Sequence, residues 1–461
     1  MDLLTQVASI VEKIGPGVEA LAARLAGPAE TAAARVAPGE LEQQCRDLGL
    51  AVAHELFVHL VQAYGDGKQG TMVRCPCGAW RRWVGTRSRT LRDLMNRELT
   101  VRRAYYFCDT CGQGWLPLDE QLGLTGAQAT PALYEVAVLC GSVAPPEEAA
   151  ELLARVAGIA VSAKSLERYT KAAGAAADQA LDRRAETVLT ETPLTPPPGP
   201  STPPRPYNLQ LDGGMLRMRE GGFREVKVAC LFDARERAEV HEGRHVLLHP
   251  HYEAHLGGPA RVGQLAYVAA RAAGVTADGS NAISQGDGAP WVWHLVQEHW
   301  PAALEVLDFY HLSEHLHAGA QALWGVGSAR ARAWARAVGA QVLTGDAGVV
   351  RAALGRVRPT TPAGTEAVAA LRRYVQTHQH RMRYGEVRAQ GYAVASAAVE
   401  SAHHGVVQRR LKRPGQRWSE RGAQQILAAR RLWCNRASPA DVTTLATVSH
   451  LVGPGYRRRA A

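Results

Sequence analysis

A proline-rich stretch limits what this chain can fold into more than any other feature. Eight of the fifteen residues from Thr192 to Pro206 are proline, so neither a helix nor a central strand can run through them. We predict an extended linker at residues 191–206 between separately folded parts, and 461 residues suffice for about three domains. Hydrophobic spacing predicts helical regions over residues 1–70 and 130–190, and the chain ends in a basic tail, residues 436–461.

Four cysteines form two close pairs, each followed by glycine: Cys75 with Cys77, and Cys108 with Cys111. Two tight turns at the tips of hairpins deliver four thiolates to one tetrahedral zinc ion. We therefore predict a structural zinc ribbon at residues 71–118, with all four cysteines as zinc ligands. The first pair has one intervening residue where two are usual, so a ribbon that no longer binds metal is the alternative.

A second DNA-binding element is predicted between the ribbon and the linker. Glu147–Val156 and Val161–Arg168 have the pattern of two short helices joined by a glycine-containing turn, which is typical of a helix-turn-helix. Lys164 and Arg168 lie on the exposed face of the second helix and are predicted to contact DNA. An ordinary helical hairpin is the alternative interpretation.

After the linker the pattern changes to short apolar runs separated by glycine. The predicted strands are 207–212, 215–219, 225–232, a run reaching Asp287, and 303–307, with helices at 262–273 and 290–299. This order predicts a mixed α/β sheet built from two hairpins and then crossovers. The histidine-rich segment from His241 to His255 is predicted to be a solvated loop, and residues 312–435 are predicted to be helical.

Three acidic residues in this part have a suggestive placement. Asp212 ends the first predicted strand, Asp287 ends the fourth, and Glu400 lies in a helix. Taken singly, each is explained as a turn aspartate or a solvated glutamate. Together, three oxygen ligands are suited to hold two Mg²⁺ ions about 3.5–4 Å apart, the arrangement that drives in-line phosphodiester displacement.

Positive charge gathers just after Glu400. The whole chain has a formal charge of +10 with only six lysines, and guanidinium groups suit phosphate. A GC-rich genome also explains abundant arginine, alanine and glycine. We predict DNA contacts by a basic run with one tryptophan, which either stacks on a base or simply packs. Its residues are Arg409, Arg410, Lys412, Arg413, Arg417 and Trp418.

This series of motifs resembles the DDE transposases of bacterial insertion sequences, ISKra-type branch, from about residue 40 to residue 435. The matching motifs are Asp212-Gly213, Glu225-Val226-Lys227, Gly286-Asp287-Gly288-Ala289 before Trp291, Leu307 to His311, Val399-Glu400-Ser401, Arg410-Leu411-Lys412 and Gly415 to Ser419. The sequence departs from the family where Ala395-Ser396-Ala397-Ala398 replaces a Gly-Ser-Gly run, and in the shortened first cysteine pair.

The resemblance implies an α/β protein with an RNase H-like catalytic core in two parts, residues 207–311 and 391–435, separated by a helical insertion at residues 312–390. It implies that the three acids are catalytic and bind Mg²⁺ or Mn²⁺, with Asp308 and His311 in supporting roles. Water would nick one strand, and the freed 3′-hydroxyl would attack target DNA. The implied partners are double-stranded DNA, both terminal repeats and target, and a second copy of the chain.

Other functions remain open from the sequence. A domesticated transposase that binds DNA without cutting it is one alternative, and a nuclease that never joins strands is another. The N-terminus lacks the basic region of a signal peptide, and the apolar stretches are too short to cross a bilayer. We therefore expect a cytoplasmic, nucleoid-associated protein without membrane contact.

Overall fold

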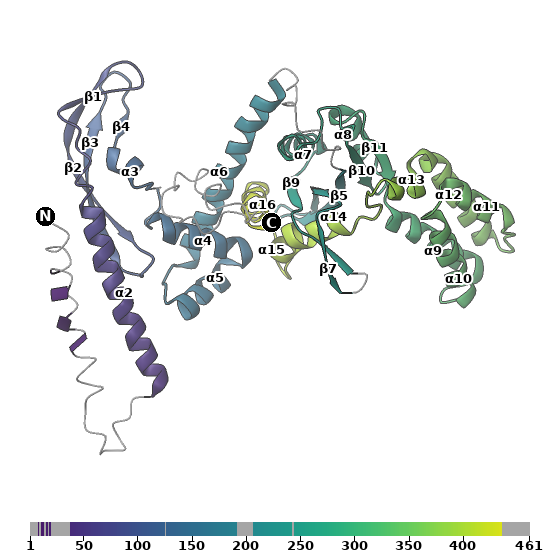
Figure 1. Cartoon of the computed structure of the whole chain (residues 1–461), viewed down its shortest axis with the longest axis horizontal. Coiled ribbons are helices and arrows are strands. Elements are labelled where there is room, and N and C mark those ends of the chain that lie inside the picture. Colours follow the sequence, from purple (N-terminus) through teal and green to yellow (C-terminus); the bar gives the residue numbers. More distant parts are fainter. Residues whose placement is uncertain are drawn as a thin grey trace. The chain divides into compact units, whose positions relative to one another are not determined.

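The chain divides into two compact units, residues 1–170 with 438–461 and residues 171–437 (Figure 1). The computed structural model describes residues 37–124, 126–190, 206–241 and 244–435, together with isolated positions between 8 and 19. The predicted tail at residues 436–461 lies outside the described residues. So do the predicted linker, apart from Pro206, and much of the first 36 residues.

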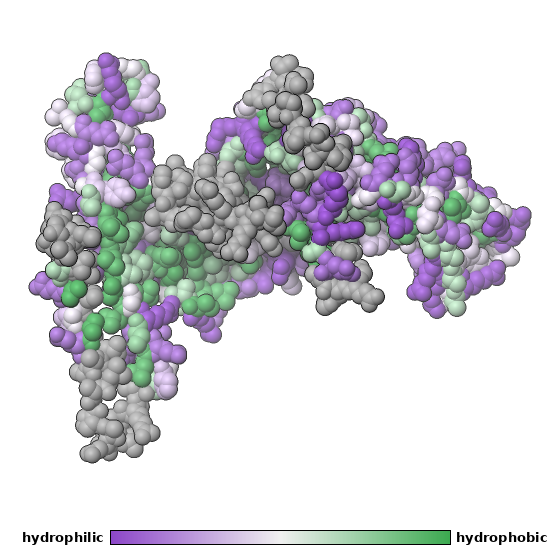
Figure 2. Space-filling view, in the orientation of Figure 1, coloured by the Kyte–Doolittle hydropathy of each residue, from purple (hydrophilic) through white to green (hydrophobic). Residues whose placement is uncertain are grey.

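The first unit contains a small antiparallel sheet. Its strands pair in chain order: β1 (Met72–Arg74), β2 (Trp80–Arg92), β3 (Glu98–Phe107) and β4 (Gly114–Trp115). The C-terminal end of helix α2 (Pro38–Gln62) contributes Val61 to a core shared with Leu91 and Leu99 of the sheet. Leu56 and Leu60 of α2 are exposed hydrophobic residues. Figure 2 shows how hydrophobic and hydrophilic residues are distributed over one face of the molecule.

The remainder of the first unit is helical. Its elements are α3 (Pro117–Gln121), α4 (Pro131–Val143), α5 (Pro146–Leu152), a π-helix η1 (Leu153–Ala157) and the start of α6 (Ala163–Thr190). Gly158 ends η1 in the left-handed region, with φ of 67°, and Ser162 Oγ accepts a hydrogen bond from the Ser165 amide at 3.2 Å. The expected glycine-containing turn is therefore present and Ser162 caps the helix that follows it, but this second helix is 28 residues long rather than short.

The second unit is built on a mixed five-stranded sheet. Its strands are β5 (Tyr207–Arg217), β6 (Phe223–Asp233), β9 (His251–Leu256), β10 (Ala282–Gly286) and β11 (Leu304–Leu307), in the order β11-β10-β5-β6-β9. β5, β6 and β9 pair antiparallel, whereas β10 and β11 run parallel to β5. A separate hairpin joins β7 (Arg237–His241) to β8 (Arg244–Leu247).

Two sequence predictions about this sheet were wrong. The runs at 207–212 and 215–219 form one continuous strand, β5, and Asp212 lies inside it rather than at its end. Gly214 continues that strand and makes room for a neighbouring side chain. A Cβ atom at this position would lie only 2.9 Å from Cε1 of His403. The third antiparallel strand is β9, which lies within the histidine-rich segment predicted to be a loop.

Helices cover both faces of the sheet (Figure 1). Helices α7 (Pro259–Ala273) and α8 (Pro290–His299) pack with Leu209, Leu211 and Leu231. The opposite face packs against a series of shorter elements through residues such as Val226 and Val228. These elements are α14 (Ala397–Ala402), the π-helix η3 (His403–Gln408), α15 (Arg409–Leu411) and α16 (Glu420–Cys434).

Five helices and a short 3₁₀ turn stand between β11 and α14. They are α9 (Phe309–Trp324), α10 (Ala329–Val342), α11 (Ala347–Arg356), α12 (Pro362–His378), η2 (Gln379–Arg381) and α13 (Tyr384–Ala389), the green group in Figure 1. Their buried residues, such as Leu312, Val350 and Val375, belong to the same hydrophobic core as Leu209 and Leu211. A continuous hydrophobic core therefore joins this region to the sheet, and η2 lies against β11.

Candidate functional site

The four paired cysteines converge in the first unit. The Sγ atoms of Cys75 and Cys111 lie 3.6 Å apart, those of Cys77 and Cys108 lie 3.7 Å apart, and all four lie within 4.8 Å of one another. A zinc ion with four Zn–S bonds of about 2.3 Å separates its sulfur ligands by ~3.8 Å in a tetrahedron. The cluster therefore fits a structural metal such as zinc.

The two cysteine turns differ in length by one residue, and each is closed by a backbone hydrogen bond from its glycine. In the shorter one the Gly78 amide donates to the Cys75 carbonyl at 2.9 Å, and in the longer one the Gly112 amide donates to the Cys108 carbonyl at 2.9 Å. Both glycines have positive φ. Hydrogen bonding by the Cys111 amide lowers the pKa of Cys108 to about 6, which favours the thiolate that a metal requires. The four sulfur atoms therefore lie together although the first turn is one residue shorter than usual.

Asp212 and Asp287 lie side by side in the second unit. β10 pairs with β5 in parallel, with Gln285 opposite Gln210. Asp212 lies two residues after Gln210, and Asp287 lies two residues after Gln285. Burial raises the pKa of Asp212, and the nearby Asp287 carboxylate raises it further, against the lowering effect of His403 and His311. The neighbouring Asp287 charge therefore disfavours ionisation of Asp212.

A histidine missed by the sequence reading contacts the first acid. His403 begins the π-helix η3, and its Nε2 lies 3.3 Å from Oδ2 of Asp212 as an electrostatic contact rather than an aligned hydrogen bond. Burial lowers the pKa of His403, which favours the neutral ring. Single-turn π-helices are frequent at functional sites, but no signal in the sequence predicts one here.

Asp308 and His311 form a pair close to the acids. The buried Asp308 caps α9 by accepting from the His311 amide at 3.0 Å, and its Oδ2 lies 2.8 Å from Nδ1 of His311. This hydrogen bond raises the pKa of His311 to about 9, and the nearby Asp287 carboxylate adds to the effect. A protonated imidazole therefore balances part of the negative charge.

Glu400 is exposed in α14, and its Oε1 accepts a hydrogen bond from Oγ of Ser396 at 2.9 Å. Within the described part of the chain, the four cysteines are the one group of His, Cys, Asp or Glu residues with at least three ligand atoms inside 4.8 Å. Asp212, Asp287 and Glu400 therefore do not converge as closely as the cysteines do. The structure brings the first two acids together and leaves the third on a neighbouring helix.

The predicted DNA-binding residues differ in accessibility. Lys164 and Arg168 are exposed on α6, and Arg409, Lys412 and Arg417 are exposed after η3. Arg413 is half-buried.

Two members of the basic run pack against the protein, and for the tryptophan this was one of the two predicted outcomes. Arg410 is only 2% exposed and lies over the ring of Trp418. Trp418 donates from Nε1 to the Leu411 carbonyl at 2.9 Å, and its backbone pairs with Met218. Both side chains therefore pack in this structure instead of facing a ligand, because this loop is anchored to the end of β5.

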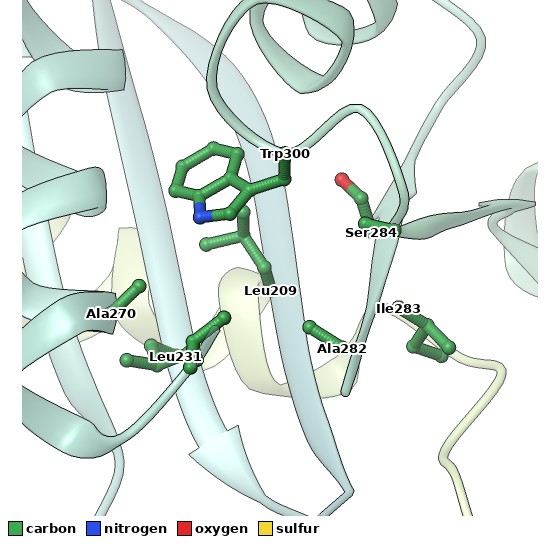
Figure 3. A pocket seen from close by; sticks show the side chains of 9 residues that line it. Leu209, Leu231, Ala270, Ala282, Ile283, Ser284 and Trp300 are labelled. Atoms are coloured by element: carbon green, nitrogen blue, oxygen red, sulfur yellow. The ribbon is translucent and has the colours of Figure 1, made fainter. Parts of the chain in front are cut away.

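A narrow apolar space lies under the sheet, away from the acids. Leu209, Ala270, Ile283 and Trp300 line it, with Ser284 beside them (Figure 3). It has no room for a water molecule, so it is a packing gap rather than a substrate site.

Part of the chain matches a known protein family. Residues 262–442, well under half of the chain, match the Uncharacterised protein family (UPF0236). This match includes Asp287 and Glu400 but neither Asp212 nor the cysteines. No curated protein matches the chain. Among the described residues, no helix is long and apolar enough to cross a membrane.

Proposed function

We propose that the chain is a DDE transposase that cleaves DNA at element ends and transfers the strand to target DNA. One observation carries the proposal: Asp212 lies in β5, Asp287 directly follows the neighbouring parallel strand β10, and Glu400 lies on a helix packed against the same sheet. The motif series that resembles this family has its acids at these positions.

The strand arrangement supports an RNase H-like core. The sequence predicts a mixed sheet of two hairpins followed by crossovers, and the resemblance implies an RNase H-like core. β5, β6 and β9 form an antiparallel set, and β10 and β11 extend it on the other side of β5. The helices α9 to α13 then occupy the place of the implied insertion, between the second and third acids.

The acid residues fit a hard divalent cation. Asp212, Asp287 and Glu400 offer only oxygen ligands, and the pKa of Asp212 is raised mainly by burial, with a smaller contribution from the Asp287 carboxylate. Mg²⁺ or Mn²⁺, when bound there, supplies charge stabilisation for phosphodiester cleavage. The protein contributes the placement of Asp212 within β5 and of Asp287 at the end of the paired strand β10, and His311 places a further positive charge beside them.

Exposed aromatic and basic residues in the ribbon support DNA as the partner. Trp80 is 48% exposed, and the Arg74 guanidinium lies 4.1 Å from the centre of its ring. Lys68 Nζ lies 3.7 Å from the ring centre of Trp83. Aromatic faces stack on bases and the cations neutralise phosphates. The exposed cations Arg409, Lys412 and Arg417 add a basic surface to the unit that carries the acids.

The test is strand cleavage by the purified full chain with Mg²⁺ and DNA carrying the element's terminal repeats. Asp287→Asn and Glu400→Gln are expected to lower the cleavage rate by about a thousandfold or more, since several kcal/mol of transition-state stabilisation is lost. The matched control is Asp278→Asn, in an exposed turn, which should leave the rate unchanged.

Product analysis separates the remaining alternatives. Strands joined to target DNA support a transposase, whereas nicked DNA that is never joined indicates a nuclease. Tight, salt-sensitive binding with no cleavage under Mg²⁺ or Mn²⁺ indicates a silent DNA-binding protein. Equal cleavage by the wild type and both acid variants contradicts the assignment.

A further inference from the structure

The segment that leads into α14 is fixed by buried side-chain amides of β5. Asn208 Nδ2 donates to the Ala393 carbonyl at 2.9 Å, and Gln210 Nε2 donates to the Ala395 carbonyl at 2.8 Å. The Val399 amide donates to Gln210 Oε1 at 3.0 Å. A single side chain, Gln210, therefore contacts the backbone on both sides of the start of α14.

A third amide ties this arrangement to the strand that carries the second acid. Gln285 Oε1 accepts hydrogen bonds from both Asn208 Nδ2 and Gln210 Nε2, each at 2.8 Å. The three amides are almost completely inaccessible, at 0%, 0% and 1% exposed. Gln210 precedes Asp212 by two residues, and Gln285 precedes Asp287 by two. The hydrogen-bonded amides of Gln210 and Gln285 therefore each lie two residues before one of the first two acids.

Asp308 and Ser396 complete the connection to Glu400. Asp308 Oδ1 accepts from the Ser396 amide at 2.6 Å, while the Asp308 amide donates to the Gly286 carbonyl at 2.8 Å. Ser396 Oγ then donates to Glu400 Oε1 at 2.9 Å. The carboxylate of Glu400 is exposed, so this bond restricts a side chain that would otherwise sample several rotamers.

We propose that Ser396 and Gln210 are positioning residues that set the third acid relative to the first two. Gln210 holds the backbone of α14 against β5, and Ser396 orients the Glu400 carboxylate. The inference rests on the proposed function of the three acids as metal ligands. Partners that orient metal ligands commonly contribute 10–100-fold to metal affinity or activity, so roughly that effect is expected here.

The first experiment measures Mn²⁺ affinity by electron paramagnetic resonance in the zinc-loaded full chain. Ser396→Ala is expected to weaken Mn²⁺ binding about tenfold. In a Glu400→Gln background the same change is expected to have less than about a twofold effect, because Ser396 acts through Glu400. The matched control is Ser401→Ala, an exposed serine of the same helix, which should bind Mn²⁺ like the wild type.

A second readout separates positioning from general stability. In Ser396→Ala, kcat for cleavage should fall while the Kd for DNA and the midpoint of thermal unfolding stay at the wild-type values. Unchanged Mn²⁺ affinity in Ser396→Ala overturns the proposal. So does a loss of the same size in the Glu400→Gln background, or an activity loss matched by loss of DNA binding and fold.

The two failures are distinguishable. If the chain binds Mn²⁺ through the acids and Ser396→Ala weakens that binding, positioning holds even where no DNA cleavage occurs, and only the transposase assignment fails. If the wild type and Glu400→Gln bind Mn²⁺ equally, Glu400 is not a ligand and the positioning role is overturned.

Discussion

The two candidate metal centres of this chain are built in opposite ways. The cysteine cluster brings four soft ligands within 4.8 Å from two short turns. The acid cluster uses hard oxygen ligands, one in β5, one at the end of the adjacent strand β10 and one on a helix more than a hundred residues further along. The first is closed and local. The second is open and depends on how distant segments pack.

This difference separates a structural site from a site that can act on a ligand. A closed set of four thiolates leaves no coordination position for a substrate. Three carboxylates, two half-buried and one exposed, leave positions open, and fixed partners such as Asp308 and Ser396 hold their geometry. The cysteine centre should therefore fail when one ligand is lost, whereas the acid centre should also fail when a buried supporting residue is changed.

The largest effect is expected at the cysteine cluster. Cys108→Ser should lower zinc content from about one ion per chain to near zero, because zinc sites of this kind contribute on the order of 10 kcal/mol to local folding. Residues 71–118 should then become sensitive to limited proteolysis. Atomic absorption measures the zinc, and Cys45→Ser, at an exposed cysteine of α2, is the control. Full zinc retention in Cys108→Ser contradicts a closed four-cysteine site.

An intermediate effect is expected at the buried amide that supports the acid centre. Gln210→Leu removes the partners of the Val399 amide and the Ala395 carbonyl and should destabilise the second unit by about 3 kcal/mol. Hydrogen exchange of β5 amides measures this change without assuming a single unfolding transition. The control is Gln321→Leu, exposed on α9. Equal exchange in the two variants would mean that α14 is held by other contacts.

The same contrast explains what the sequence could and could not predict. Cysteine spacing and the following glycines are local signals, and the predicted cluster assembled despite its shortened turn. In contrast, Asn208 and Gln210 alternate with Leu209 and Leu211, a pattern that indicates a strand with one solvated face. That polar face is buried against the segment 393–399, about 185 residues away, which alternation cannot encode.

The glycines after Asp212 were misread for a related reason. A glycine pair commonly marks a turn, yet here it continues the strand because a ring from η3 occupies the space beside Gly214. The histidine-rich strand β9 was missed because its burial is decided by α16, whose Arg431 pairs with Glu253 at 3.0 Å. Tertiary partners overrode local propensity in both places.

The smallest expected effect concerns the balance of charge between His311 and the carboxylates of the acid centre. In metal-free chain the His311 pKa of about 9 lies above its usual 6.5, so the protonated form stabilises the fold. That contribution is complete below pH 6.5 and is lost as the pH rises from 6.5 to 9. His311 is 36% exposed, so screening reduces it to about 1 kcal/mol.

The difference in unfolding free energy between wild type and His311→Gln should therefore shrink as the pH rises through that window, as urea titrations in EDTA would measure. Imidazole NMR gives the His311 pKa directly. Saturating Mg²⁺, with no Mn²⁺ present, should lower the pKa of His311 if the bound cation neutralises the charge of Asp212 and Asp287. An imidazole that titrates near 6.5 without metal would mean that Asp308 does not hold it protonated, and that the acid centre is balanced from elsewhere.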